Sequence, residues 1–378
     1  MLVDIIAGAR PNFMKISPII RAIKARIENG SALRYRLIHT GQHYDREMSG
    51  AFFEQLGIPD PDLNLAVGPG TQAVQTAGIM IAYERVLLEQ RSDLCLVVGD
   101  VTSTMACAIV AQKLHVPVAH VEAGIRSGDW KMPEEINRIV TDSISNLFLT
   151  TSESAGTALL ASGTKPTAIH FVGNTMIDTL MVNLNKLSAP EFFFENGLER
   201  GRYFVLTLHR PSNVDDNART LDLLRIISDE AGETPIVFPV HPRTAKMLEG
   251  AVWQLPNIVA VPPQAYHQFN WLVRESKGVI TDSGGISEET TFLGIPCITL
   301  RDSTERPETI DIGTNVLIGN DMDLLSRSIR DVKQGKWKSG AIPEKWDGHA
   351  GERIAEILDT MAKTLADAKQ QDTNDISN

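Results

Sequence analysis

The stretch VDIIAGARPNFMKISPII, residues 3–20, carries the pattern that decides the fold. An apolar run is followed by an Arg-Pro pair and then by a segment with helical periodicity. A similar pattern returns in YFVLTLHRPSNVDDNARTLDLL, residues 203–224. Strand–loop–helix units that repeat along a chain build parallel sheets covered by helices on both faces. The two similar beginnings therefore hint at two related open sheets that face each other across a cleft.

The rest of the chain continues this alternation. Predicted strands cover residues 3–7, 35–40, 94–98, 116–121, 147–150, 168–172, 203–208, 236–240, 258–261, 278–281 and 297–300. Predicted helices between the first of these strands include residues 18–27, 71–89 and 105–114. We therefore predict an α/β fold with a first domain at residues 1–172 and a second at 173–367. The last helix could pack back on the first domain, and the polar residues 368–378 are predicted to be a disordered tail.

Composition excludes several classes of function. The 378 residues carry 36 Lys and Arg against 47 Asp and Glu, a net charge of −11, whereas nucleic-acid binding without sequence preference needs a basic face. Three scattered cysteines form no disulfide framework, so we expect a reducing compartment. No CxxC or HExxH motif suggests zinc, and no apolar stretch reaches membrane-spanning length. We therefore expect no nucleic-acid, metal or membrane partner.

The first strand–helix loop is a candidate anion site. Arg10 and Lys15 flank it, and their charges could neutralise a diphosphate; the alternative is ordinary surface charge at the start of a helix. No GxGxxG motif follows the first strand, and no GxxxxGK[ST] motif occurs anywhere. The sequence therefore gives no support to a dinucleotide site or a P-loop.

A second candidate phosphate site is TDSGGISEE, residues 281–289. A predicted strand ends just before Ser283 and Gly284, which lead into a helix. Glycines let the backbone approach an anion, and a helix N-terminus offers unpaired N–H groups to it. Glu289, in the first helical turns, could accept hydrogen bonds from a ribose. The alternative is a helix cap whose acids complement the helix dipole.

Acidic residues gather where predicted strands end. Asp100 and Glu122 each follow an apolar strand, and Glu134 and Glu135 fall in the first turn of a helix that a proline opens. Asp100 could be a helix cap, and Glu135 is explained by the helix dipole alone. Carboxylates that converge at one sheet edge can raise one another's pKa, which produces acid/base groups near neutral pH. His209, at the end of the first strand of the second half, would face these acids.

Nine motifs occur in order along the chain: GARPNFMKISPI, TGQH, VVGDVTST, HVEAGIRSGDWKMPEEINR, FVGNTMID, LTLHRPSN, FPVHPR, TDSGGISEE and ERPET. Taken together, these segments resemble the non-hydrolysing UDP-N-acetylglucosamine 2-epimerases. The resemblance implies two Rossmann-like domains arranged as in GT-B glycosyltransferases. It also implies a cytoplasmic homodimer that interconverts UDP-GlcNAc and UDP-ManNAc without nicotinamide or metal cofactors.

The resemblance also implies a mechanism. The C2 proton of the sugar is removed and UDP is eliminated, giving a 2-acetamidoglucal, and UDP then adds back while C2 is reprotonated on its other face. The family's catalytic residues fall on Asp100, Glu122, Glu134 and His209. Its UDP contacts fall on Arg10, His241, Ser283, Gly284 and Glu289, to which Lys15 can add a charge at the diphosphate.

Departures from the family pattern leave the sugar open. Pro211 stands where bacterial members carry a second arginine, Ser287 replaces a usual glutamine, and the segment after TGQH is longer. The substrate could instead be a UDP-2,3-diacetamido uronic acid. A GT-B glycosyltransferase, a hydrolysing epimerase and a non-catalytic sugar-nucleotide sensor also remain open. Gln42 and His43 are candidate contacts of a second, activating substrate, but Pro211 lacks the charge for that site, so we expect the activation to be lost.

Overall fold

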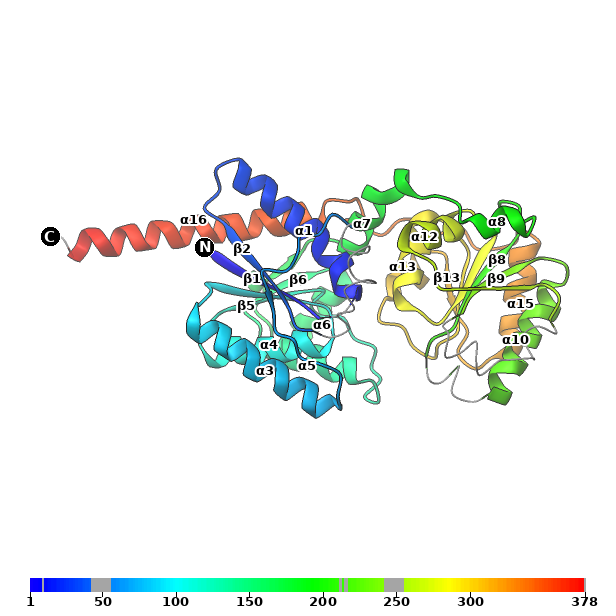
Figure 1. The fold of residues 1–378 in the computed structure, drawn as a ribbon, viewed down its shortest axis with the longest axis horizontal. Coiled ribbons are helices and arrows are strands. Elements are labelled where there is room, and N and C mark those ends of the chain that lie inside the picture. The colour runs from blue at the N-terminus through cyan, green and yellow to red at the C-terminus, as the bar shows by residue number, and fades with distance from the viewer. Residues whose placement is uncertain (9, 42–55, 211–212, 214–216, 241–254, 377–378) are drawn as a thin grey trace. The chain divides into compact units, whose positions relative to one another are not determined.

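The computed structural model describes residues 1–8, 10–41, 56–210, 213, 217–240 and 255–376, apart from the side chains of residues 10, 11, 217 and 368–376. The chain divides into two compact units. Unit 1 comprises Met1–Met181 and Glu344–Asn378, and unit 2 comprises Val182–Pro343. Each unit is a parallel sheet with helices packed on it (Figure 1).

Unit 1 is built on a seven-stranded sheet in the order β3-β2-β1-β4-β5-β6-β7, as far as the chain is described. Its strands are β1 (Leu2–Ala7), β2 (Arg34–His39), β3 (Leu63–Asn64), β4 (Leu94–Val98), β5 (Val118–Val121), β6 (Leu147–Thr150) and β7 (Ile169–Phe171). Its helices are α1 (Arg10–Glu28), α3 (Gln72–Glu89), α4 (Thr102–Lys113), α5 (Pro133–Ile144), α6 (Glu153–Ala161), α7 (Thr175–Asn183) and α16 (Ala350–Ile376). The order reverses at β1, so β1 and β4 form the switch point where open α/β sheets bind ligands.

Unit 2 repeats this plan on a six-stranded sheet in the order β10-β9-β8-β11-β12-β13, again among the described residues. Its strands are β8 (Phe204–Thr207), β9 (Ile236–Pro239), β10 (Ile258–Val261), β11 (Gly278–Thr281), β12 (Cys297–Thr299) and β13 (Asn315–Leu317). Its helices are α8 (Glu191–Glu195), α10 (Asn217–Ala231), α12 (Tyr266–Arg274), α13 (Gly284–Leu293), α14 (Pro307–Asp311) and α15 (Met322–Lys333). The predicted fold, two parallel-sheet α/β units, is confirmed.

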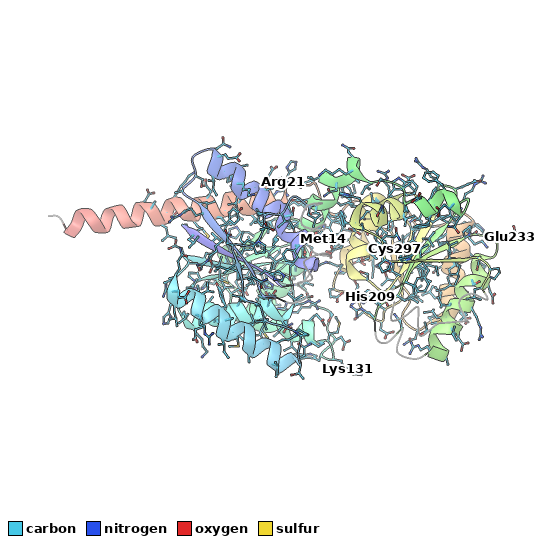
Figure 2. The ribbon with its side chains drawn as sticks, viewed as in Figure 1. Met14, Arg21, Lys131, His209, Glu233 and Cys297 are labelled. Carbon is cyan, nitrogen blue, oxygen red and sulfur yellow. The ribbon has the colours of Figure 1, made fainter. Side chains whose placement is uncertain are left out.

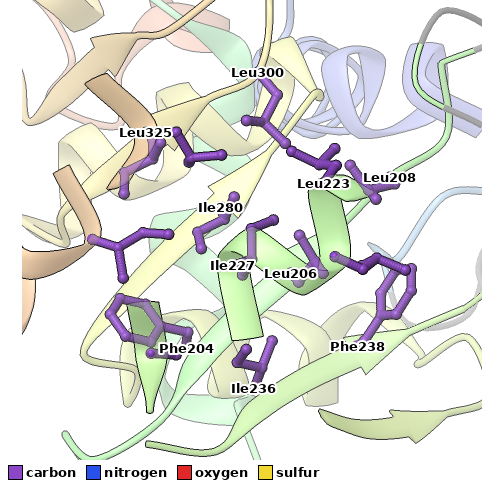
Figure 3. Packing of buried hydrophobic residues seen from close by; sticks show 14 of the residues in the cluster. Phe204, Leu206, Leu208, Leu223, Ile227, Ile236, Phe238, Ile280, Leu300 and Leu325 are labelled. Atoms are coloured by element: carbon purple, nitrogen blue, oxygen red, sulfur yellow. The ribbon is translucent and has the colours of Figure 1, made fainter. Parts of the chain in front are cut away.

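The core of unit 2 shows why its strands read as continuous apolar runs. Phe204, Leu206 and Ile280 on the sheet pack against Leu223 and Ile227 of α10 (Figure 3). The other face of the same strands packs a second cluster, which includes Tyr203, Val205 and Val279. Helices therefore cover both faces, which is why these strands are largely apolar on both sides.

Helix α1 begins eight residues earlier than the sequence predicts. The sequence analysis placed this helix at residues 18–27, and a proline inside a helix lacks the N–H that the interior needs. Pro18 instead lies inside α1, and the carbonyl of Met14 that loses its partner accepts a hydrogen bond from Thr179 Oγ1 at 2.5 Å. A tertiary contact thus replaces the missing helical bond, and α1 can reach back to the end of β1.

The end of the chain belongs to unit 1. The sequence analysis counted residues 344–367 with the second domain, but it also allowed the last helix to pack back on the first. Helix α16 packs along α1 (Figure 1). At Gly351 the contact is so close that an added Cβ would lie 2.6 Å from the Pro18 carbonyl oxygen, and the Gly351 N–H donates to Asp178 Oδ2 at 2.7 Å. The backbone of α16 stays helical to Ile376, through most of the tail that was predicted to be disordered.

Candidate functional site

The first group of candidate residues lies where β4 and β5 of unit 1 end. These strands pair in parallel with Val98 opposite Val121, so the residues that follow them emerge at the same edge. Glu122 follows β5, and its Oε2 lies 2.6 Å from Nζ of Lys15 on α1. Both side chains are largely buried, at 2% and 14% exposed. The structure thus brings together two of the predicted residues, one acid and one base, from elements far apart in the chain.

The backbone around this pair is specialised. Gly99, which follows β4, has φ of +68°, and a Cβ added there would lie 3.2 Å from Lys15 Nζ and 3.6 Å from Glu122 Oε2. Glu122 itself has φ of +67°, a conformation that costs most non-glycine residues about 1–3 kcal/mol. Such strain is typical of functional positions, so the geometry supports a role for Glu122 beyond packing.

Asp100 is held by helix α5. It forms an ion pair with Arg138, and Asn137 Nδ2 donates to the Asp100 carbonyl at 2.8 Å. The residue that caps α4 is Val101, so the interpretation of Asp100 as a helix cap is wrong. Asp100 and Glu122 are therefore each paired with a basic side chain, whereas the sequence analysis expected the acids mainly to raise one another's pKa.

Glu135 does more than complement the helix dipole. It accepts hydrogen bonds from the N–H groups of Ser127 and Gly128, at 2.9 and 3.0 Å, and from Arg138 at 2.8 Å. Burial tends to raise the pKa of Glu135, but these hydrogen bonds outweigh it and the pKa is lowered. Glu135 thus fixes both the loop before α5 and the arginine that pairs with Asp100.

Glu134 lies in the first turn of α5, which Pro133 opens as predicted. It is half-buried. Among the described residues, no hydrogen bond or ion pair of its side chain is found within the chain. Its carboxylate is therefore available to a ligand in a way that the buried Glu135 is not.

The sequence analysis missed a buried hydrogen-bond network next to these residues. His120 on β5 places Nε2 2.9 Å from the Gly99 carbonyl oxygen and Nδ1 2.7 Å from Asp142. Asp142 also accepts from Arg126 at 2.6 Å and from the Gly124 N–H at 3.1 Å. Burial works to raise the pKa of Asp142, but His120 and Arg126 lower it. The network ties the loop after β4 to the loop after β5.

In unit 2, His209 follows β8, and its side chain is paired with a buried carboxylate. Its Nδ1 lies 2.5 Å from Oδ1 of Asp282, whose side chain is fully buried, while His209, which Figure 2 labels, is exposed. Asp282 also accepts from the N–H groups of His209 and Arg210 and from Asn213. Burial tends to raise the pKa of Asp282, but His209 and these donors lower it. A buried carboxylate that orients an exposed imidazole suits a histidine used in proton transfer or phosphate binding.

Next to His209 lies the start of helix α13. Ser283 occupies the N-cap position without using its side chain as a cap, and the helix begins at Gly284. A Cβ added to Gly284 would lie 3.3 Å from Nη1 of the buried Arg301, which pairs with Glu305 at 2.7 Å. The unpaired N–H groups of a helix start and a nearby guanidinium form a site that fits an anion. Arg301 lies outside the residues that the sequence analysis singled out.

Glu289, the predicted ribose contact, is buried in α13. Burial raises its pKa to about 8; a hydrogen bond with Asn270 opposes the shift, and the charge of Glu288 adds to it. Glu288 is paired with Arg306. The two neighbouring acids therefore have different environments, and within the described part of the chain only Glu288 of the two has an ion-pair partner.

Several predicted contacts fall outside the described residues or side chains. Arg10 begins α1, but its side chain is not described. His241, Gln42, His43 and Pro211 lie outside the described residues altogether. Within the described part of the chain, no cluster of three or more His, Cys, Asp or Glu side chains could hold a metal ion. No helix there combines the length and apolar character needed to cross a bilayer.

Comparison with known proteins identifies the family of the chain. A family model described as UDP-N-acetylglucosamine 2-epimerase matches residues 25–359. A UDP-N-acetylglucosamine 2-epimerase of Methanocaldococcus jannaschii is 40% identical over 370 residues, covering 95% of this chain and 99% of the relative. A UDP-2,3-diacetamido-2,3-dideoxy-D-glucuronate 2-epimerase of Pseudomonas aeruginosa is 39% identical, covering 93% and 98%.

Solved structures agree with this placement. The M. jannaschii enzyme in complex with UDP-GlcNAc and UDP matches with a TM-score of 0.83, covering 95% of this chain and 99% of that one. A UDP-glucosyltransferase of Polygonum tinctorium, 12% identical, shares the fold alone, with a TM-score of 0.57. The protein is thus a two-domain α/β protein with a GT-B-like fold. Within that class, the chain belongs to the UDP-N-acetylglucosamine 2-epimerase family.

Proposed function

We propose that this epimerase interconverts UDP-GlcNAc and UDP-ManNAc by eliminating UDP to a 2-acetamidoglucal and adding it back. The observation that carries the proposal is the Lys15–Glu122 pair behind Gly99, with Glu122 in a strained backbone conformation. Removal of a C2 proton needs a fixed carboxylate, and its return on the other face needs a second acid/base group. Asp100 and Glu134 are the candidates for that second group.

Departure of UDP needs charge stabilisation, because C2 is not activated by a carbonyl group. We assign this role in unit 2 to the start of α13 at Ser283 and Gly284, with Arg301 beside it and His209 adjacent. Preorganised donors aimed at developing negative charge are usually the largest catalytic contribution. In unit 1 we assign it to Lys15 and Arg10. The remaining UDP contacts that we propose are Glu289 and His241.

Incubation with UDP-GlcNAc in D2O, without added nicotinamide or metal, tests this function. We expect proton NMR to show UDP-ManNAc forming and deuterium entering C2 of both sugars. The Glu122→Gln variant is the matched control, because it keeps the shape of the side chain but not its charge, and it should give neither product nor exchange. Turnover that retains the C2 hydrogen would exclude solvent-exchanging proton abstraction. Unchanged UDP-GlcNAc at high enzyme concentration would exclude this substrate.

A second candidate substrate comes from the P. aeruginosa relative, whose 39% identity nearly equals that of the M. jannaschii enzyme. If UDP-GlcNAc is left unchanged, the same exchange experiment with a UDP-2,3-diacetamido-2,3-dideoxy-glucuronate separates a change of sugar from a glycosyltransferase activity. We also propose that the protein is a cytoplasmic homodimer.

A further inference from the structure

A buried polar cluster joins helices α12 and α13 of unit 2, which pack against each other (Figure 1). Tyr266 and Asn270 lie four residues apart and therefore on the same side of α12, and Glu289 lies on α13. These side chains are 8%, 1% and 4% exposed, and we call the three residues the α12–α13 cluster. Residues 271–273, which directly follow Asn270, are buried and apolar, so packing alone does not explain a polar side chain at Asn270.

The hydrogen bonds of the α12–α13 cluster are incomplete within the described part of the chain. Asn270 forms a hydrogen bond with Glu289, and its Nδ2 donates to the Tyr266 carbonyl oxygen at 3.4 Å. Neither Oδ1 of Asn270 nor the hydroxyl oxygen of Tyr266 has a hydrogen-bond partner among the described residues. Buried polar groups are normally paired, so two open groups in one cluster require an explanation. Leucine and phenylalanine would fill the same space without this cost.

Both residues of α12 act on Glu289 as donors. Burial raises the pKa of Tyr266, and the charge of Glu289 raises it further, so the hydroxyl keeps its proton. Burial also raises the pKa of Glu289, the hydrogen bond from Asn270 lowers it, and the charge of Glu288 raises it. Glu288 itself is paired with Arg306. The donors on α12 therefore favour the ionised form of Glu289, against the effects of burial and of Glu288.

We propose that Asn270 and Tyr266 are positioning residues, which hold the carboxylate of Glu289 for the ribose hydroxyls of the nucleotide. This inference rests on the proposed function, in which Glu289 contacts the ribose. A carboxylate accepts hydrogen bonds on both oxygens, whereas the neutral acid keeps a proton on one of them. The two neighbouring hydroxyls of a ribose therefore bind best to the ionised form that the α12 donors favour. A site built in this way rejects a nucleotide that lacks the hydroxyls.

Calorimetric titration with UDP and with its 2′,3′-dideoxy analogue tests this role. The wild type should bind UDP about 100-fold more tightly, because the analogue has no hydroxyl for Glu289. Asn270→Leu keeps the size of the side chain but removes its amide. This variant should bind UDP about 10-fold more weakly and the analogue as the wild type does, so the preference for UDP falls to about 10-fold. A purely structural role would weaken both nucleotides equally.

Asn257→Leu is the matched control for Asn270→Leu. Asn257 directly precedes β10, whereas α13 follows the end of β11, so the two lie at opposite edges of the same parallel sheet. The Asn257 amide donates to the carbonyls of Ser228 and Gly232, at 2.8 and 2.7 Å. Its loss should lower the melting temperature and leave the preference for UDP at about 100-fold.

Tyr266→Phe keeps the test open if Asn270→Leu does not fold, because it removes a single oxygen atom. Loss of a buried hydroxyl without a partner should not lower the melting temperature of the ligand-free protein, yet the preference for UDP should fall about 3- to 10-fold. Tyr203→Phe is its control. The Tyr203 hydroxyl donates to the Leu272 carbonyl at 2.7 Å, so that variant should melt at a lower temperature and keep the preference.

The outcomes separate this inference from the proposed function. If the wild type prefers UDP but folded Asn270→Leu and Tyr266→Phe proteins keep the full preference, the positioning role is overturned and the proposed function stands. Equal weakening of both nucleotides has the same meaning. A wild type that binds UDP and the analogue alike would overturn the ribose contact of Glu289, and this inference with it. A wild type that binds no UDP would overturn the proposed function as well.

Discussion

Glu122 combines features that are costly when taken singly. It is buried, it takes a left-handed backbone conformation, and its carboxylate is paired with Lys15. Removing a charge from water costs several kcal/mol, which a close ion pair only partly offsets. The protein nevertheless buries this charge at a residue that follows β5 and lies beside Gly99. His209 differs from Glu122, because its own side chain is exposed and only its partner Asp282 is buried.

Glu289 gives a pH-dependent prediction. Its pKa in the folded protein is raised from 4.5 to about 8, so the stability it contributes is fully present below pH 4.5 and is lost as the pH rises through about 8. The isosteric, neutral Glu289→Gln variant should therefore melt at a higher temperature than wild type at pH 8. The difference should shrink toward pH 5. Thermal melting at both pH values measures it.

The neighbouring acid is the control for this prediction. Glu288→Gln removes the carboxylate that pairs with Arg306, so that variant should be destabilised at both pH values. A Glu289→Gln protein that is less stable than wild type at pH 8 would show that its carboxylate is ionised and held by a partner.

Single residues also mark where prediction from the sequence stops. Asp100, Glu122 and His209 could be found because each lies at the end of an apolar strand, and parallel strands end at a common edge. Their partners could not be found in the same way. Arg138 and Asp282 lie 38 and 73 residues from the side chains that they hold, and nothing local in either segment indicates the pairing. Contacts of that range depend on how the sheet is ordered.

At the scale of elements, the ends of β4 and β5 and the start of α5 form one supported unit. His120 on β5 bonds to the carbonyl of Gly99 after β4, and Asp142 on α5 holds both His120 and the loop at Gly124. The sequence predicted the strands and the proline that opens α5, because these depend on local patterns. It did not predict the network, because a buried histidine within an apolar strand has no distinctive pattern. Pro18 is the corresponding case for helices, since the hydrogen bond from Thr179 to the Met14 carbonyl is a tertiary contact that no local pattern indicates.

This support predicts the effect of changing His120. Asparagine is too short to reach both Gly99 and Asp142, so His120→Asn should let the two loops shift. A displacement of about 1 Å at a catalytic group can cost about 100-fold in rate, and we expect kcat to fall by about 10- to 100-fold with a smaller change in KM. Initial rates of epimerisation measure both constants.

His115→Asn is the matched control for His120→Asn. His115 is exposed and has φ of +58°, a conformation that asparagine tolerates well. That variant should keep wild-type kinetics. If His120→Asn keeps the wild-type kcat while remaining folded, the network is structural only and does not position the loops after β4 and β5 for the reaction.

At the scale of the whole molecule, unit 1 is assembled from both ends of the chain. Helix α16 packs on α1 through buried residues that include Ile354, Leu358 and Ala362. The polar contact of Ser31 with Asp359 extends the same packing. The sequence could not assign α16 to unit 1, because an amphipathic helix that follows the second domain can pack on either one. The close approach at Gly351 and the hydrogen bond that Asp178 accepts hold α16 on unit 1, and both are tertiary contacts.

This connectivity predicts that a change in the last helix weakens the unit that carries the Lys15–Glu122 pair. Leu358 is fully buried, and Leu358→Ala should lower the stability of unit 1 by about 2–5 kcal/mol. Calorimetry should show the transition of unit 1 moving to lower temperature while that of unit 2 stays in place. Thr360→Ala, at an exposed position of the same helix, should move neither transition. Because Lys15 lies on α1, against which α16 packs, thermal loss of epimerase activity in Leu358→Ala should follow the shifted transition. Activity that instead follows the unmoved transition would show that α16 does not support the Lys15–Glu122 pair.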